Sequence, residues 1–204
     1  MIANAELRDR DHAPCEDQFV HLGGVTWADY ERLLEIRGDS SAPRITYLEG
    51  TLEIMSPSAP HESIKSTIGC LVEVWCLERD IEFTSYGSWT LKSSRKKRGA
   101  EPDECYVFGE VPKKKRPDLA IEVIWTYGGI DKLDVYRKLG VPEVWYWDEG
   151  RIAVHRLRGE RYAAVARSVV LRGIDLEQLA SFLDRPTTSR AIRDYRNALR
   201  KLSA

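Results

Sequence analysis

The chain lacks the long apolar runs and cysteine pairs that mark many membrane and secreted proteins. No apolar stretch approaches the ~18 residues that a transmembrane helix requires, and the polar N-terminus has no signal-peptide core. The four cysteines, Cys15, Cys70, Cys76 and Cys105, are scattered and form no CxxC pair, which predicts free thiols and no zinc site. We therefore expect a protein of the reducing cytoplasm, without a membrane partner.

An excess of charge of either sign is also absent. With 31 Lys and Arg against 32 Asp and Glu, the net charge is −1, so any attraction to polyanions must come from local patches. Two basic stretches, residues 92–98 and 113–116, are candidates for neutralising phosphates. They contain no aromatic residues for base stacking, and a pair of solvated loops is the alternative interpretation.

Helical and strand patterns alternate along the 204 residues, of which 43% are hydrophobic. This order predicts an α/β or α+β domain, with a mixed central sheet flanked by helices. We expect a loosely ordered leader over residues 1–24, the domain over residues 25–173 and a helical C-terminal extension over residues 174–204. The main predicted elements are a helix capped by Thr26, a hairpin turning at Glu49 and Gly50, a helix over residues 61–80, single strands over residues 81–92 and 100–108, and a helix over residues 131–139.

Residues 117–125 (PDLAIEVIW) form a short apolar run between a proline and a Gly-rich break, the pattern of a buried central strand. Glu122 lies in the middle of this run. A lone carboxylate is costly to bury, so Glu122 needs a cation beside it, either a basic side chain or a metal ion. Strand alternation places Glu122 on the less apolar of the two faces, as expected for a surface that faces a site.

Asp103 is a second acid, placed at the entry of a predicted strand directly after Pro102. Neighbouring strands joined by a connection of this length can hold Asp103 and Glu122 side by side on one sheet face. Two close carboxylates repel each other and raise each other's pKa values, and a divalent cation removes that penalty. The pair is therefore a candidate site for Mg²⁺ or Mn²⁺. A turn or strand-entry role for Asp103 and a core salt bridge for Glu122 are the alternative interpretations.

The order and spacing of these motifs resemble the PD-(D/E)xK nuclease superfamily and, more narrowly, the Uma2 family of restriction-endonuclease-like bacterial proteins. The resemblance covers roughly residues 25–157 and implies a restriction-endonuclease-like fold. The matching stretches, in chain order, are VTWADY (25–30), YLEGTLEIMSP (47–57), His61, EPD (101–103), RPDLAIEV (116–123), DKLDVY (131–136) and LGVPEVW (139–145).

The resemblance implies that Asp103 and Glu122 bind the metal ion, with the backbone carbonyl of Val123 as a further ligand. The lysine that the superfamily places two residues after the glutamate is replaced here by Ile124. In Uma2-like sequences a lysine of the following helix takes this role, and that position corresponds to Lys132.

Two further positions are implied by the resemblance. The family often has an acid three positions before the hairpin aspartate, but here that position holds Thr46, and Glu49 is the hairpin acid. His61 lies near the start of the long helix, where a side chain can point into the site. Glu49 and His61 complete the set of candidate catalytic residues.

Together these features predict a Mg²⁺- or Mn²⁺-dependent endonuclease that hydrolyses DNA phosphodiester bonds. Lys132 would position the attacking water or offset developing negative charge. A homodimer fits, because cutting both strands of a duplex needs two sites and the C-terminal helix has an apolar face. Two alternatives stay open: a catalytically silent module that binds nucleic acid or protein, favoured by Ile124, and a hydrolase of another phosphate ester.

Overall fold

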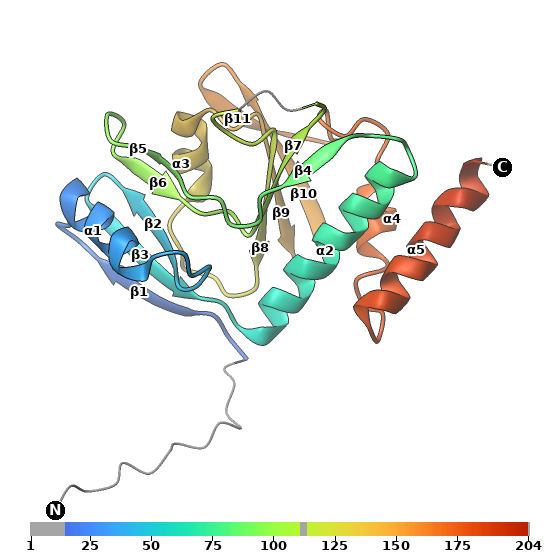
Figure 1. Cartoon of the computed structure of the whole chain (residues 1–204), viewed down its shortest axis with the longest axis horizontal. Coiled ribbons are helices and arrows are strands. Elements are labelled where there is room, and N and C mark those ends of the chain that lie inside the picture. Colours follow the sequence, from blue (N-terminus) through green and yellow to red (C-terminus); the bar gives the residue numbers. More distant parts are fainter. Residues whose placement is uncertain (1–14, 111–113, 204) are drawn as a thin grey trace, which may run out of the picture.

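The computed structural model describes residues 15–110 and 114–203, which form two β-sheets and the helices that cover them (Figure 1). The strands are β1 (Gln18–Leu22), β2 (Arg44–Leu48), β3 (Thr51–Ser56), β4 (Phe83–Ser85), β5 (Leu91–Ser93), β6 (Arg98–Ala100), β7 (Glu104–Phe108), β8 (Leu119–Ile124), β9 (Glu143–Asp148), β10 (Arg151–Arg158) and β11 (Arg161–Val165). The helices are α1 (Trp27–Arg37), α2 (Ala59–Leu77), α3 (Lys132–Leu139), α4 (Leu176–Ala180) and α5 (Thr188–Ser203).

A six-stranded mixed sheet forms the centre of the fold, in the order β11-β10-β9-β8-β7-β4. β8 and β9 run parallel, with α3 in the connection between them, and the other neighbours are antiparallel. β8 therefore has a partner on each side, as the apolar run of residues 117–125 predicts. Residues 119–123 are all buried, which confirms the predicted central strand.

Helices cover both faces of this sheet (Figure 1). α2 and α4 pack on one face, where Ile121 and Val123 join Trp145 in the main core cluster, and α5 packs outside them against α2. α3 packs on the other face, where Ala120 and Val135 belong to a second cluster. The predicted mixed central sheet flanked by helices is thus confirmed. Within the part of the chain that the structure describes, no helix is both long enough and apolar enough to cross a lipid bilayer.

A second sheet, which the sequence pattern did not indicate, is five-stranded and antiparallel, in the order β1-β3-β2-β6-β5. α1 covers one face of it, where Tyr30 and Leu52 are buried. The predicted hairpin is confirmed as β2 and β3. Glu49 and Gly50 at its turn have φ angles of 47° and 98°, as a two-residue turn that matches the strand twist requires.

The single strand predicted over residues 81–92 is wrong. β4 lies at the edge of the six-stranded sheet, whereas β5 lies at the edge of the five-stranded sheet. The chain changes sheets between them, where Gly87 has a φ of 54° that other residues rarely adopt. The strand predicted over residues 100–108 divides in the same way, because β6 and β7 belong to different sheets. Alternation of side chains is the same in either sheet, so it cannot reveal the change.

The prediction of a loosely ordered leader over residues 1–24 is wrong for its last part. β1 pairs in register with β3 at the edge of the five-stranded sheet. Most side chains of β1 are exposed, so the strand is held mainly by its backbone pairing with β3. Its sequence therefore has no periodic apolar pattern that would predict a strand. Residues 1–14, and Lys113 of the second basic stretch, lie outside the described residues.

The C-terminal extension packs on the domain. Tyr195 and Leu199 of α5 are buried in the same core cluster as Ile68 and Leu71 of α2. The apolar face of α5 is therefore covered within the chain and does not support the predicted homodimer. The position of the domain boundary and the homodimer itself stay predictions.

Replacing Leu199 by alanine tests whether α5 is an integral part of the core. Leu199 is 2% exposed, so Leu199→Ala should lower the free energy of unfolding by about 2–4 kcal/mol, the usual cost of such a cavity. Arg193→Ala, on the exposed face of the same helix, should change it by less than about 0.5 kcal/mol. Urea denaturation measures both effects, and an equally small effect of the two changes would show that α5 is only loosely attached.

Candidate active site

Glu122 lies on β8 and is 2% exposed. The alternation of β8 sends Ile121 and Val123 into the main core cluster and Glu122 to the opposite face, which α3 covers. The register of β7 and β8 pairs Glu104 with Ile121. Asp103, one residue before Glu104, therefore comes beside Glu122, as the connection between the two strands predicts.

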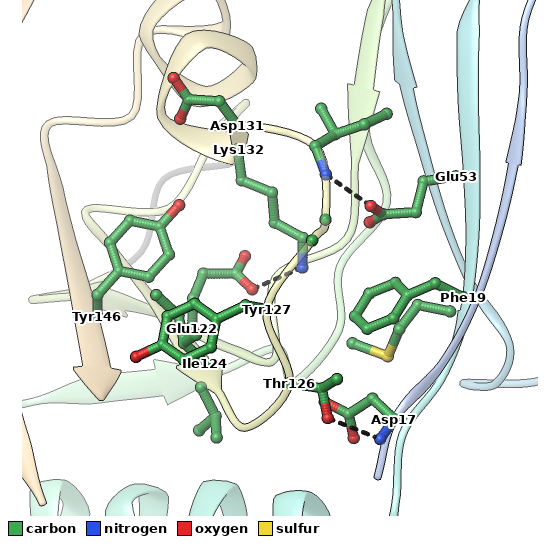
Figure 2. Close-up of a pocket in the computed structure, with 15 residues that line it drawn as sticks. Asp17, Phe19, Glu53, Glu122, Ile124, Thr126, Tyr127, Asp131, Lys132 and Tyr146 are labelled. Carbon is green, nitrogen blue, oxygen red and sulfur yellow. Dashed lines mark hydrogen bonds and ion pairs between the residues drawn. The ribbon is translucent and has the colours of Figure 1, made fainter. Parts of the chain in front are cut away.

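Two side chains of α3 donate hydrogen bonds to Glu122. Lys132 Nζ lies 2.7 Å from Oε2 (Figure 2), and the Tyr136 hydroxyl donates to Oε1. These two residues are four positions apart and so share one face of the helix, which Asp131 caps at its N-terminus. Burial and the neighbouring charge of Asp103 raise the pKa of Glu122, although Lys132 opposes this shift. The structure thus brings Lys132 to Glu122.

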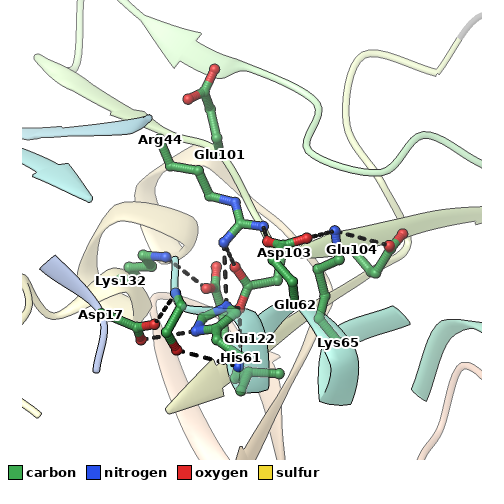
Figure 3. Close-up of polar contacts among 12 residues, drawn as sticks. Asp17, Arg44, His61, Glu62, Lys65, Glu101, Asp103, Glu104, Glu122 and Lys132 are labelled. Atoms are coloured by element: carbon green, nitrogen blue, oxygen red, sulfur yellow. Dashed lines mark hydrogen bonds and ion pairs between the residues drawn. The ribbon is translucent and has the colours of Figure 1, made fainter. Parts of the chain in front are cut away.

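Asp103 is fully buried and surrounded by donors (Figure 3). Arg44 Nη1 lies 2.5 Å from Oδ1, and His61 Nε2 lies 3.1 Å from Oδ2. The backbone N–H of Val123 donates to the same Oδ2 at 2.6 Å. Burial alone would raise the pKa of Asp103, but the charge of Arg44 and the hydrogen bond from His61 hold it well below its usual range. Asp103 is therefore an anion in the folded chain.

His61 lies between two carboxylates, those of Asp103 and Asp17 (Figure 3). Its Nδ1 is 2.9 Å from Asp17 Oδ2, and its Nε2 faces Asp103. Nε2 also lies 3.3 Å from Arg44 Nη1, which can only donate. The carboxylates beside both ring nitrogens favour the imidazolium form of the ring. Burial lowers the pKa of His61, but the hydrogen bonds to Asp103 and Asp17 outweigh burial and raise it to about 9. His61 thus enters the site as a fixed cation.

Asp17 is a residue of this cluster that no sequence pattern indicates. It precedes β1 and is 5% exposed. Its Oδ1 accepts the N–H of Ser58, 41 positions away at the start of α2, and its own N–H donates to Thr126 Oγ1, 109 positions away. Contacts over such distances in sequence leave no local signal.

The structure does not bring Glu49 to this cluster. The Glu49 side chain is 67% exposed at the turn between β2 and β3, and its partner is Arg98 at 2.9 Å. Another acid of the hairpin, Glu53, is 1% exposed and faces the site from β3. β3 pairs Glu53 with Thr46, so this acid lies directly across the ladder from the position where the resemblance implies one.

A cavity of about 310 Å³ opens beside Glu122, between the two sheets (Figure 2). Its size lies at the lower end of the range for small-molecule sites. Asp103 is fully buried and is not part of the cavity wall. The wall combines four acids and a lysine with three aromatic rings, which belong to Asp17, Glu53, Glu122, Asp131, Lys132, Phe19, Tyr127 and Tyr146.

Asp103 and Glu122 are the residues whose chemistry best fits a divalent metal ion. Their oxygens are the hard ligands that Mg²⁺ prefers, and the repulsion that helps to raise the pKa of Glu122 is one that a divalent cation removes. Among the described residues, no three or more His, Cys, Asp or Glu side chains are grouped as a metal site. An ion held by these two carboxylates and completed by water or substrate stays a prediction. The carbonyl of Val123 as a further ligand stays a prediction.

The mixed sheet, the buried carboxylate pair and the lysine beside it define a restriction-endonuclease-like protein. The chain belongs to the Uma2 family, whose sequence profile matches residues 27–183 and is described as "putative restriction endonuclease". This confirms the resemblance and supports a nuclease. Among solved structures, the chain is similar to a protein from Anabaena variabilis described as "a putative nuclease belonging to DUF820", with a TM-score of 0.48, 16% identity, and coverage of 79% of this chain and 96% of that one. A search of curated proteins found no match.

The charge of His61 makes stability depend on pH. Its pKa is raised from 6.5 to about 9 in the folded chain, so its contribution is complete below about pH 6.5 and is lost as the pH rises through about 9. The shift is worth about 3 kcal/mol at most. Urea denaturation of the wild type should show this decline, and His61→Gln should flatten it. His155→Gln, whose pKa is shifted downward instead, should keep the decline; a level wild-type profile over this range contradicts the prediction.

Proposed function

We propose that this chain is a divalent-metal-dependent nuclease that hydrolyses phosphodiester bonds of DNA. The observation that carries the proposal is the buried pair of Asp103 and Glu122, with Lys132 bonded to Glu122 at the cavity wall. The description of the family as restriction endonucleases supports the same reaction.

Lys132 supplies positive charge to the proposed site. Burial alone lowers its pKa, but the charges of Glu122 and Asp103 raise it above its usual value, so the side chain is an ammonium. An ammonium cannot accept a proton from water. Lys132 therefore orients the attacking water or offsets the negative charge that develops on the phosphoryl group. The Tyr136 hydroxyl, bonded to the second oxygen of Glu122, fixes the orientation of that carboxylate.

Asp103 and Glu122 are the residues that would hold Mg²⁺ or Mn²⁺. Such an ion, when bound, supplies Lewis-acid chemistry that polarises a phosphoryl oxygen and lowers the pKa of water. Arg44 and His61 keep Asp103 ionised, which is the form that binds a cation. Arg44 Nη2 also lies 2.7 Å from Glu62 Oε1, so the guanidinium has a second carboxylate partner besides Asp103.

DNA as the substrate, the cytoplasm as the location and a homodimer as the assembly belong to the same proposal. The family description supports DNA. The four free cysteines fit a reducing compartment. The homodimer follows from the need for two sites to cut both strands of a duplex.

A catalytically silent module that binds nucleic acid or protein is the second candidate. Glu122 accepts hydrogen bonds at both oxygens, and Asp103 is ion-paired with Arg44 and His61, so the fold offsets the charge of both carboxylates without a metal ion. Ile124 in the usual lysine position favours the same alternative.

Glu122→Gln and Lys132→Ala test the proposed hydrolysis. With Mg²⁺ or Mn²⁺ the wild type should cut single- or double-stranded DNA, and each variant should lose about 10²–10³-fold in rate, because a group that acts on developing charge is removed. Glu177→Gln, an exposed acid of α4 outside the cavity wall, should cut at the wild-type rate. Thermal unfolding checks that all variants fold. Cleavage that persists in both Glu122→Gln and Asp103→Asn would refute the assignment of these carboxylates to the active site.

Metal titration separates the two candidate functions. An ion that binds only the folded chain stabilises it by about 2.7 kcal/mol at a concentration one hundred times its Kd, so Mg²⁺ or Mn²⁺ should raise the Tm of the wild type. Glu122→Gln should abolish this rise, whereas Glu177→Gln should retain it. A wild-type Tm that responds to neither metal, together with retained binding of DNA or of a protein, identifies the silent module.

A further inference from the structure

One face of the five-stranded sheet carries a row of polar side chains across three strands. His21 on β1 pairs with Glu53 on β3, and Glu53 pairs with Thr46 on β2. Side chains directly opposite each other on neighbouring strands point to the same face. Glu53 lies in the middle of this row and is 1% exposed. A carboxylate buried in this way requires donors that compensate for its lost hydration.

The donors to Glu53 come from β1 and from the loop that precedes α3. The backbone N–H of Ile130 donates to Oε2 at 2.6 Å, and His21 Nε2 lies 2.9 Å from the same oxygen. The contact with Ile130 crosses from the five-stranded sheet to a loop of the six-stranded sheet, and Figure 2 draws it as the dashed line that ends at Glu53. Hydrogen bonds to an ionised acceptor are roughly twice as strong as neutral ones. This hydrogen bond therefore links β3 of the five-stranded sheet strongly to the loop before α3.

The glycines of this loop fit its close approach to Glu53. Gly128 has a φ of 111°, which residues with a side chain rarely adopt. A Cβ added at Gly129 would lie 3.0 Å from Glu53 Oε2 and 3.6 Å from Phe19, so even a methyl group would make the acid or the loop shift by a few tenths of an ångström, and a larger side chain by more. The Gly-Gly break after β8 thus does more than end the strand, because it lets the backbone reach Glu53.

Ile130 is joined directly to the residues that place Lys132. Asp131 caps α3 by accepting the N–H of Leu133 at 3.0 Å, and Lys132 is the first helical residue. From there Lys132 reaches Glu122 at 2.7 Å. Holding the Ile130 N–H therefore holds the start of α3, and with it the position of the ammonium in the cavity.

We propose that Glu53 is a positioning residue, which holds the loop before α3 so that Lys132 meets Glu122. The effect on cleavage rests on the proposed nuclease function, whereas the positioning itself does not. Loss of the Glu53 acceptor should loosen residues 129–132 and free Lys132 from its ion pair.

Glu53→Ala and Glu53→Gln separate positioning from general stability. Glutamine keeps an oxygen that accepts the Ile130 N–H, and alanine does not. In Glu53→Ala, amide hydrogen exchange of residues 129–132 should rise about tenfold or more, because a hydrogen bond to a charged group is lost. Lys132 should also react faster with acetic anhydride, since it is no longer held by Glu122. Glu53→Gln should return both readouts close to the wild type.

Glu143→Ala is the matched control. Glu143 is also a buried acid on a strand, and it accepts a loop N–H from Val169 at 2.8 Å. This variant should raise exchange near Val169 and leave residues 129–132 unchanged. Gly129→Val is an independent route to the same test, because its Cβ already lies 3.0 Å from Glu53 Oε2 and its two further methyl groups need space beyond that. It should reproduce the loosening even where Glu53→Ala does not fold. Wild-type exchange and acylation in Gly129→Val and in folded Glu53→Ala would overturn the proposal.

Kinetics connect the positioning with the reaction. In a wild type that cuts DNA, Glu53→Ala should lower kcat about tenfold with KM near the wild-type value, because the substrate contacts remain while the charge is misplaced. Glu53→Gln should recover most of this loss, and a change in KM alone would overturn the catalytic part. A wild type that cuts no DNA refutes the proposed nuclease, and the exchange and acylation results then decide the positioning by themselves.

Discussion

Two neighbouring buried carboxylates, Asp103 and Glu122, are the constraint on which the organisation of this fold depends. An uncompensated charge in a protein interior costs roughly several kcal/mol, so each acid needs donors, and no single element supplies them all. Arg44 comes from β2, His61 from α2 and Lys132 from α3. The five-stranded sheet is therefore part of the site, because it brings one of the cations that the six-stranded sheet needs.

The compensating cations need partners in their turn, and this extends the network through the molecule. His61 is an imidazolium between Asp103 and Asp17, and Arg44 is shared between Asp103 and Glu62. Buried networks of this kind are stable only when their members are satisfied, since low dielectric strengthens both the contacts and the penalties. This explains why the segment before β1, which has almost no apolar signal, is nevertheless tied to α2 and to the loop after β8.

The parts of this structure that sequence could predict are those set by near neighbours. The central strand with Glu122, the turn at Glu49 and the helix that begins at Lys132 follow from patterns within one element. The separation into two sheets and the role of Asp17 could not be predicted, because they depend on contacts between distant segments. Glu53 lies between these cases: once the turn is centred on residues 49 and 50, simple counting pairs position 46 with position 53. The acid that is missing at position 46 is therefore replaced by Glu53 on the paired strand. A motif defined by spacing along the chain does not include this position.

The position of the lysine on α3 and the contact of Glu53 with the preceding loop are structurally related. A lysine two residues after Glu122 would be placed by β8 itself, since both residues would share one face of a rigid, buried strand. Ile124 stands there instead, and the charge comes from Lys132, on a helix that a glycine-containing loop separates from the strand. A loop with two glycines has more conformational freedom than a strand, so the geometry of the ion pair depends on whatever holds that loop. The Glu53 carboxylate, bonded to the loop one residue before the helix cap, supplies the constraint that the strand would otherwise provide.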